Sequence, residues 1–301
     1  MDRSDFRYVD FDRRALSPEI ATLFPDWVPG DERVMVFCPH DDDGPLGAGY
    51  AILAAQANGG EVFVGIFCDG WAGYSTPAEA STIVARRAEE TVHAYAQLGI
   101  AADHILRFNY PDLGLWPRIG WRLPDGQPGT MAQTIPALRR LRITRLLVPN
   151  GYREHIDHEA TYRIGAYDGP QAGDAILAEH GPASPIRSFA QYAVWADLSP
   201  EDALVQGRPA YLRANRAIVA PPSVEEKITA AVRCWASQQQ VIAGIMAARR
   251  AHRVRHGRAV ELYLAFDPRP TLDYTPYHAL IAQISGESTS SNQEESDALH
   301  L

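Results

Sequence analysis

The sequence predicts a three-layer α/β fold, in which helices cover both faces of a mostly parallel sheet. Two observations lead to this prediction. Short runs of apolar, β-branched and aromatic residues recur along the chain, and stretches with helical periodicity separate them. A helix between two strands usually returns the chain to the same edge of the sheet, so the strands run in parallel. We therefore expect a doubly wound, Rossmann-like sandwich.

The first elements form a strand–helix–strand unit. Residues 33–39 (RVMVFCP) and 61–68 (EVFVGIFC) are apolar runs that are too short for helices, and they predict two buried strands. Residues 46–58 contain many small residues and predict a helix, which Gly59 and Gly60 end. This unit sets the parallel direction of the sheet.

The alternation continues through the middle of the chain. Residues 77–99 carry an apolar stripe at helical spacing and predict a crossover helix. Strands are expected at residues 104–108 and 145–150, with a helix at residues 132–141 between them. These elements repeat the strand–helix order of the first unit.

The later elements extend the same core. Residues 187–195 and 259–266 predict two more strands, and residues 224–250 predict one long amphipathic helix. Although 301 residues are enough for two domains, α/β folds of this size often form one core, so we expect a single domain at residues 1–285. Residues 286–301 have almost no apolar content, and we expect a disordered tail.

The composition limits the classes of function. With 46% apolar residues, 22% charged residues and a net charge of -9, the chain resembles a globular protein that has no electrostatic basis for binding nucleic acid or an anionic membrane. The start of the chain is charged where a secretory signal would be apolar, and no run is long enough to span a membrane. We therefore expect a cytoplasmic protein with no nucleic-acid or membrane partner. Assembly into a homo-oligomer stays open.

Two groups of reactive side chains follow predicted strands. Residues 40–43 (HDDD) place one imidazole and three carboxylates after the first strand, and their mutual repulsion is most simply relieved by a divalent metal ion. His155 and His158 follow the strand at residues 145–150, and they can face one point if a helix starts there. Either group alone is more often a helix cap or an incidental pattern. Together they match the ligands of a catalytic zinc site at the carboxyl ends of parallel strands.

At these residues the sequence resembles the PIG-L/LmbE-like family of zinc-dependent N-deacetylases. The family's first motif is commonly His-Pro-Asp-Asp-Glu after the first strand, and its second is commonly His-Pro-Asp-His. The resemblance extends over residues 34–240. It implies that a zinc ion is the cofactor and that His40, Asp43 and His158 are its ligands.

The resemblance also implies roles for the neighbouring residues. Asp42 corresponds to the general base, and His155 corresponds to the residue that stabilises the oxyanion or protonates the leaving amine. Asp157 corresponds to a carboxylate that orients a neighbouring group. Two weaker matches support the resemblance. One is Arg87 with Glu90 in an Arg-x-x-Glu helix, and the other is the pair Ser237-Gln238.

The motifs depart from the family pattern at three positions. Asp41 stands where proline is usual, Gly44 where glutamate is usual, and Ile156 where the second proline is usual. The spacing of the acids and histidines is unchanged. Because three aspartates are consecutive, the assignments of the base and of the aspartate ligand are both open to a shift of one residue, and the base is either Asp41 or Asp42.

The substrate implied by the resemblance is an N-acetylated amino sugar or a glycoconjugate that carries one, a small molecule that would release acetate and a free amine. The loop at residues 109–130 is rich in proline, glycine and tryptophan, which suits either a loop over the site or a surface excursion. We expect the aromatic rings of this region to stack on a sugar ring, namely Trp71, Tyr74, Trp116 and Trp121. Arg87 or Arg153 could bind hydroxyls or a phosphate, and the substrate-binding candidates are Arg87, Trp116 and Tyr152. The alternative is that the aromatic residues only anchor the loop.

Three other functions compete with this interpretation. Gly44, Gly47 and Gly49 do not form the GxGxxG pattern of dinucleotide sites, and the aspartates beside them would repel a pyrophosphate. A metal-dependent phosphoesterase is a stronger rival, although it usually needs more ligands than the two motifs supply. The third rival is a non-catalytic scaffold whose site has decayed, which the residues at 41 and 44 suggest.

Overall fold

The computed structural model describes residues 1–285, so the tail expected to be disordered, residues 286–301, lies outside the described residues. The chain divides into two units, Met1–Pro268 and Arg269–Leu301. In the second unit the structure describes one helix, α8 (Thr275–Ser285). The single domain expected up to residue 285 stays a prediction.

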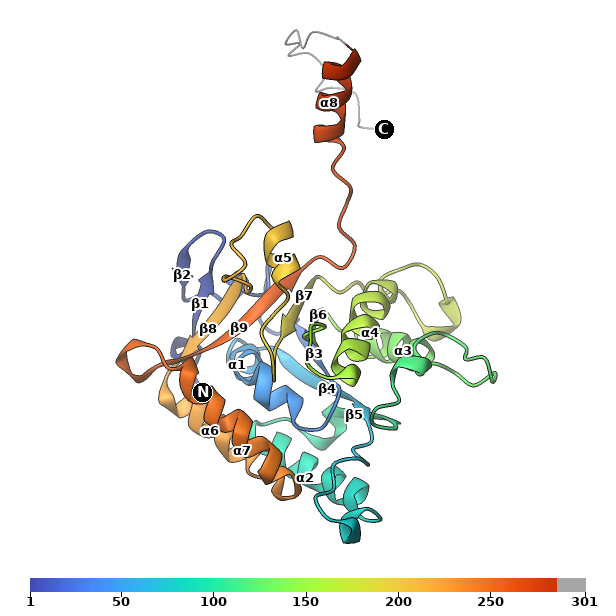
Figure 1. The fold of residues 1–301 in the computed structure, drawn as a ribbon, viewed down its shortest axis with the longest axis vertical. Helices are drawn as coiled ribbons and strands as arrows, with labels where there is room; N and C mark the ends of the chain where they lie inside the picture. Colours follow the sequence, from blue (N-terminus) through green and yellow to red (C-terminus); the bar gives the residue numbers. More distant parts are fainter. Residues whose placement is uncertain (286–301) are drawn as a thin grey trace. The chain divides into compact units, whose positions relative to one another are not determined.

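A large mixed sheet forms the centre of the first unit (Figure 1). Its strands are β1 (Arg7–Asp10), β2 (Ala15–Ser17), β3 (Arg33–Cys38), β4 (Glu61–Cys68), β5 (Ile105–Tyr110), β6 (Arg145–Pro149), β7 (Ser188–Tyr192), β8 (Arg216–Ala220) and β9 (Ala259–Phe266). Their order in the described part of the chain is β2-β1-β8-β9-β7-β6-β3-β4-β5. The α/β fold class is confirmed.

One half of the sheet departs from the expectation. Strands β3 to β7 pair in parallel, whereas β1, β2, β8 and β9 pair antiparallel to their neighbours. Strands β1, β2 and β8 were not predicted. The reason is visible in β1, whose sequence RYVD alternates buried and partly exposed residues over four positions, so it lacks the continuous apolar run that identifies a fully buried strand.

Helices cover both faces of the sheet. They are α1 (Asp43–Ala57), α2 (Ile83–Gln97), α3 (Met131–Arg140), α4 (Ile156–Ala172), α5 (Pro200–Val205), α6 (Pro222–Val232) and α7 (Gln239–Ala248). Residues of α1, α2, α6 and α7 share one apolar core, while α3 and α4 contribute to a second core. No helix within residues 1–285 has both the length and the apolar character needed to cross a membrane.

Strand β3 shows why the parallel strands are continuous apolar runs. Val34 and Val36 belong to the core beneath α1, and Met35 and Phe37 belong to the core beneath α4. Successive side chains of a strand point to opposite faces, and here both faces are covered by helices. Residues 34–37 are therefore all apolar, because each side chain is buried on one face of the sheet or the other.

The prediction of one long helix at residues 224–250 is wrong, because the structure has two helices there. Helix α6 ends at Val232 and α7 begins at Gln239. Between them the buried Trp235 leaves helical geometry, with φ -79° and ψ 71°. The N–H of Ser237 donates to the side chain of Glu90 on α2, at 3.0 Å, instead of continuing a helix. The apolar pattern runs through the break because residues on both sides face the same core.

The order of the strands creates the crevice where the candidate site lies. Strands β3 and β6 are parallel neighbours, so their carboxyl ends meet at the same edge. The helix after β3 (α1) packs into one core, and the helix after β6 (α4) packs into the other. Connections that leave neighbouring strands toward opposite faces open a crevice between them, which is where ligands bind in such sheets.

Gly47 tests how tightly α1 packs on the sheet. A Cβ atom at this position would lie 2.4 Å from the ring of Tyr192 and 2.9 Å from the carbonyl of Ala193. The Tyr192 hydroxyl donates to Phe37 O at 2.7 Å, so the ring cannot move freely. We expect Gly47→Ala to lower the free energy of unfolding by ~1 to 3 kcal/mol in urea denaturation.

The control for this measurement is Gly244→Ala in α7. An added Cβ there meets no atom within 4 Å, so helix propensity should raise stability by up to ~1 kcal/mol. Equal effects of the two substitutions would contradict the packing argument.

Candidate metal centre

A pocket of about 410 Å³ lies at the carboxyl ends of β3 and β6. Six of the candidate site residues named from the sequence line it, namely His40, Asp42, Asp43, Arg87, His155 and His158. These residues come from the loop after β3, the start of α1, helix α2 and the start of α4. The two motifs, which are more than 100 positions apart in the sequence, therefore share one cavity.

His40, Asp43 and His158 direct one ligand atom each toward a common point. Those atoms lie within 4.8 Å of one another. Asp43 Oδ2 is 3.3 Å from His40 Nδ1 and 3.3 Å from His158 Nε2. Ligand atoms bound about 2.1 Å from a tetrahedral zinc ion are about 3.4 Å apart, so this spacing suits one small divalent ion.

The hydrogen bonding of His158 indicates that a cation belongs in this space. Glu154 Oε2 lies 2.7 Å from His158 Nδ1, and a carboxylate there can only accept the Nδ1 proton. In the neutral imidazole, Nε2 then carries a lone pair. This atom is buried without a hydrogen-bond partner and faces the Asp43 carboxylate. Two buried acceptors that face each other need a proton or a metal ion between them, and a divalent metal ion fits.

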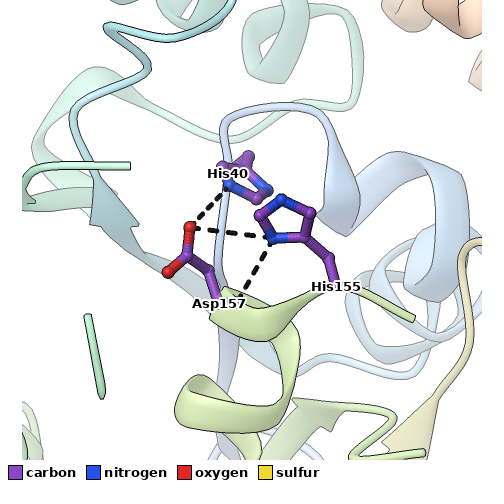
Figure 2. A group of neighbouring side chains, drawn as sticks. All are labelled: His40, His155 and Asp157. Carbon is purple, nitrogen blue, oxygen red and sulfur yellow. Dashed lines mark hydrogen bonds and ion pairs between the residues drawn. The ribbon is translucent and has the colours of Figure 1, made fainter. Parts of the chain in front are cut away.

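His40 is also supported by a carboxylate from behind. Its Nε2 is 3.4 Å from Asp157 Oδ2, while its Nδ1 faces Asp43. Figure 2 shows His40 and His155 turned toward the Asp157 carboxylate. A carboxylate on the far nitrogen is typical of histidines that bind metals, because it fixes the tautomer and the ring orientation. Asp157 therefore lies where it can orient His40, and its role stays a prediction.

The charges around the two histidines favour an added positive charge. Burial lowers the pKa of His40, but its contacts with Asp157 and Asp43 outweigh burial and raise the pKa to about 10. Burial likewise lowers the pKa of His158, and Asp43 with Glu154 raises it to about 9. In the absence of a metal ion, protons supply this positive charge, so a metal ion has to displace them.

The structure distinguishes Asp41 from Asp42. Asp41 is fully buried and lies outside the pocket lining. Its carboxylate accepts a hydrogen bond from Thr91 Oγ1 at 2.8 Å and forms ion pairs with Arg107 and Arg87. Asp42 lines the pocket and, although it is the N-cap of α1, its side chain makes no capping hydrogen bond. Burial raises the pKa of Asp42, and Arg87 partly opposes this. The geometry therefore favours Asp42 as a base.

The residues at positions 41 and 44, which depart from the family pattern, are both buried beside the pocket. A Cβ atom at Gly44 would lie 2.5 Å from the Tyr95 hydroxyl and 3.0 Å from Cys38 Sγ, so a larger residue there would require Tyr95 to move. Asp41 pairs with the buried Arg87 at 3.1 Å.

The two weaker sequence matches meet in space. Glu90 Oε2 accepts a hydrogen bond from Ser237 Oγ at 2.6 Å. The next residue, Gln238, lines the pocket and donates from Nε2 to Gly73 O at 2.7 Å. The break between α6 and α7 makes both contacts possible.

Two expected substrate-binding residues lie outside the pocket lining. Trp116 is 38% exposed in the loop after β5, and the Tyr152 ring packs under the guanidinium of Arg153. Arg87 does line the pocket, but Asp41 and Asp42 pair with its charge. The aromatic residues of the loop were assigned from composition, which does not specify the direction of a side chain.

Sequence reasoning missed several residues of the pocket. Asp112 accepts hydrogen bonds from the N–H groups of Gly70 and Ala72, at 2.9 and 3.0 Å, and holds that turn against the site. Trp195 and Val241 line the mouth but come from segments without a motif. Glu154 had one signal, because an acid four positions before a histidine at a helix start can reach it.

Comparison with known proteins identifies the relatives of this fold. The model of the PIG-L family, described as GlcNAc-PI de-N-acetylase, matches residues 35–167. No curated protein sequence matches the chain. The family match confirms the resemblance that the two motifs indicated.

Solved structures share the fold at low sequence identity. The conserved protein TT1542 from Thermus thermophilus is 22% identical over 80% of this chain and 98% of its own, with a TM-score of 0.59. N,N'-diacetylchitobiose deacetylase from Pyrococcus horikoshii is 16% identical over 79% and 84%, with a TM-score of 0.59. GalB, the 4-carboxy-2-hydroxymuconate hydratase of Pseudomonas putida, is 18% identical over 80% and 99%, with a TM-score of 0.52. Because a deacetylase and a hydratase share this fold, the fold alone does not decide the reaction.

Asp41→Asn tests the structural role of the buried carboxylate. The substitution leaves the buried guanidinium of Arg87 without its nearest charge partner. We expect the free energy of unfolding to fall by ~3 to 5 kcal/mol, as for a broken buried ion pair, measured by urea denaturation. Asp42→Asn is the matched control and should have a much smaller effect. Equal stability of the Asp41→Asn variant and the wild type would contradict this role.

Metal retention should depend on pH. Zinc has to displace protons from His40 and His158, whose pKa values lie above neutrality, so the apparent affinity should fall about tenfold per pH unit for each displaced proton as the pH is lowered from 8 to 6. Competition with a chelator at each pH measures this affinity. His40→Ala and His158→Ala should bind little zinc, and wild-type zinc content in both variants would refute the assigned ligands.

Proposed function

The PIG-L family model matches residues 35–167, and from this match we propose that the chain is a zinc-dependent deacetylase acting on an N-acetylated amino sugar or a glycoconjugate. The observation that carries the proposal is the buried, unpartnered Nε2 of His158 facing the Asp43 carboxylate beside an open pocket. The description of the family and the similarity to a diacetylchitobiose deacetylase support an amide as the bond that is hydrolysed.

His40, Asp43 and His158 would hold the zinc ion, which leaves part of its coordination shell for other molecules. Bound there, the ion supplies Lewis-acid chemistry that polarises a carbonyl group and makes water more acidic. The remaining steps depend on the side chains of the chain itself.

Asp42 is the general base in this mechanism. It lies beside Asp43 on the pocket wall, and its carboxylate is 3.6 Å from Arg87 Nη2. Burial and the charge of Asp43 raise its pKa, which makes it a better proton acceptor than a solvated aspartate. It takes a proton from the water that adds to the amide carbon.

His155 is placed to donate a hydrogen bond to the substrate. It is the N-cap of α4, and its Nδ1 accepts the N–H of Asp157 at 3.2 Å. An acceptor at Nδ1 leaves the proton of the neutral ring on Nε2. Burial lowers the pKa of His155, which favours this neutral form. The ring lines the pocket, where it can stabilise the negative charge that develops on the carbonyl oxygen.

The reaction balances with these groups. Water adds to the amide carbon as Asp42 takes its proton, and the carbon–nitrogen bond then breaks. The leaving nitrogen receives the proton that Asp42 took from the water, and the products are acetate and a free amine.

The size and lining of the pocket support a sugar-sized substrate. Its volume of about 410 Å³ falls in the range of small-molecule sites. Trp195, which is 54% exposed, lines the mouth and offers an aromatic face for the apolar side of a pyranose. In this proposal Trp195 takes the stacking role that we expected of Trp116.

A cytoplasmic location stays a prediction of the sequence.

A phosphoesterase fits the pocket less well. Asp42, Asp43 and Asp112 line it, and Arg87, the only arginine or lysine among the lining residues, is already paired with two aspartates. An anionic phosphate ester would therefore depend on the metal ion and the histidines to balance its charge, whereas a neutral acetamide carries no charge to balance. A decayed scaffold would not need to retain buried partners behind both histidines.

An amine-release assay tests the function. We expect zinc-loaded protein to release a free amine from at least one N-acetylglucosamine derivative, and Asp42→Asn to bind zinc but turn over ~10² to 10⁴ times more slowly because it lacks the base. Chelated protein is the blank, and phosphodiesters form the competing panel. Phosphate ester cleavage without amine release would replace the proposal with a phosphoesterase, and no activity on either panel would favour the scaffold.

A further inference from the structure

Glu154 lies in the loop between β6 and α4, and both of its carboxylate oxygens are engaged. Its side chain is fully buried. Oε2 is 2.7 Å from His158 Nδ1. Oε1 accepts three backbone N–H groups, from Val194, Trp195 and Ala196, at 2.8, 3.0 and 3.1 Å. One carboxylate therefore joins a candidate metal ligand to a segment about 40 positions later in the chain.

The first oxygen determines what His158 can do. A carboxylate has no proton to donate, so it holds the imidazole in the form with hydrogen on Nδ1. Nε2, the atom that faces Asp43 at 3.3 Å, is then available as a ligand. Without this partner the ring is free to place its proton on Nε2, where it would exclude a metal ion.

The second oxygen determines the position of residues 194–196. Three N–H groups directed at one oxygen form a concave donor site that suits a negative charge. The middle residue, Trp195, is 54% exposed and lines the mouth of the pocket. The segment follows β7 after Tyr192 and has no regular hydrogen-bonding pattern of its own, so the three hydrogen bonds to this carboxylate hold it beside the site, together with the packing of Val194 on the core.

We infer that Glu154 is a positioning residue with two roles, in which one oxygen keeps His158 Nε2 available for the metal ion and the other fixes the substrate-facing segment 194–196. This inference rests on the metal site of the proposed function, but not on the identity of the reaction. It extends the pattern already described for His40 and Asp157, and adds a link from the metal centre to the pocket mouth.

Glu154→Gln separates the two roles because an amide has one accepting oxygen and one donating nitrogen. If the oxygen faces residues 194–196, the amide N–H donates to His158 Nδ1 and forces the ring proton onto Nε2. If the amide is reversed, its N–H groups face three other N–H donors. Either arrangement loses one contact that the carboxylate makes in the wild type.

The experiment measures zinc affinity by competition with a chelator, together with hydrogen exchange of the zinc-loaded proteins. We expect Glu154→Gln to bind zinc ~10 to 100 times more weakly, the usual effect of losing a partner behind a metal-binding histidine. We also expect faster exchange at residues 194–196 or a ring proton on His158 Nε2 in the nitrogen-15 spectrum of the metal-free protein at high pH. Asp168→Asn is the matched control, since it alters a different buried carboxyl group, which lies in α4 and contacts Thr134.

Each outcome bears on the inference. Wild-type zinc affinity in Glu154→Gln, even with faster exchange at residues 194–196, would reduce Glu154 to a loop anchor and overturn it. If circular dichroism shows that this variant does not fold, Glu154→Asp replaces it, because the shorter carboxylate cannot span both contacts and should also weaken zinc binding. A wild-type protein that binds no zinc would refute the metal site itself, whereas zinc binding without amine release would refute only the proposed reaction.

Discussion

Asp43 Oδ2 lies 3.3 Å from His40 Nδ1 and 3.3 Å from His158 Nε2, and the rest of the pocket is organised around these two contacts. All three side chains lie at the carboxyl ends of β3 and β6, where burial makes uncompensated charge costly. These contacts are favourable only when a proton or a metal ion supplies positive charge. This requirement explains why each histidine has a further carboxylate on its far side.

The loops around the pocket are held by the same chemistry. Asp112 accepts N–H groups of the turn after β4, Asp157 accepts the N–H of Leu113 at 2.7 Å, and Glu154 accepts three from the segment after β7. Leu113 adopts a left-handed conformation with φ 61°, which is strained for leucine and is maintained by that hydrogen bond. Buried carboxylates thus position both the candidate ligands and the backbone that would face a substrate.

A second layer of charge lies behind the pocket and serves the fold. Asp41 pairs with Arg87 and Arg107, and Tyr95 fills the space beside Gly44. This layer holds the start of α1 against α2, so that Asp42 and Asp43 project from a fixed backbone. The three consecutive aspartates therefore have three different environments, although they are chemically identical in the sequence.

The sequence alone determined the parallel half of the sheet and the meeting of the two motifs. Strand β3 is visible because both of its faces are buried, and His40, Asp43 and His158 are recognisable as candidate ligands because they lie in short motifs after strands, where the sequence resembles the PIG-L/LmbE-like family. Only the tertiary structure decided that Asp42 faces the pocket, that Glu154 supports His158, and that Trp195 rather than Trp116 lines the mouth. It also decided the antiparallel strands and the break between α6 and α7. The physical reason is that these features depend on contacts between segments far apart in the chain, whereas local periodicity and spacing report only burial and neighbouring chemistry.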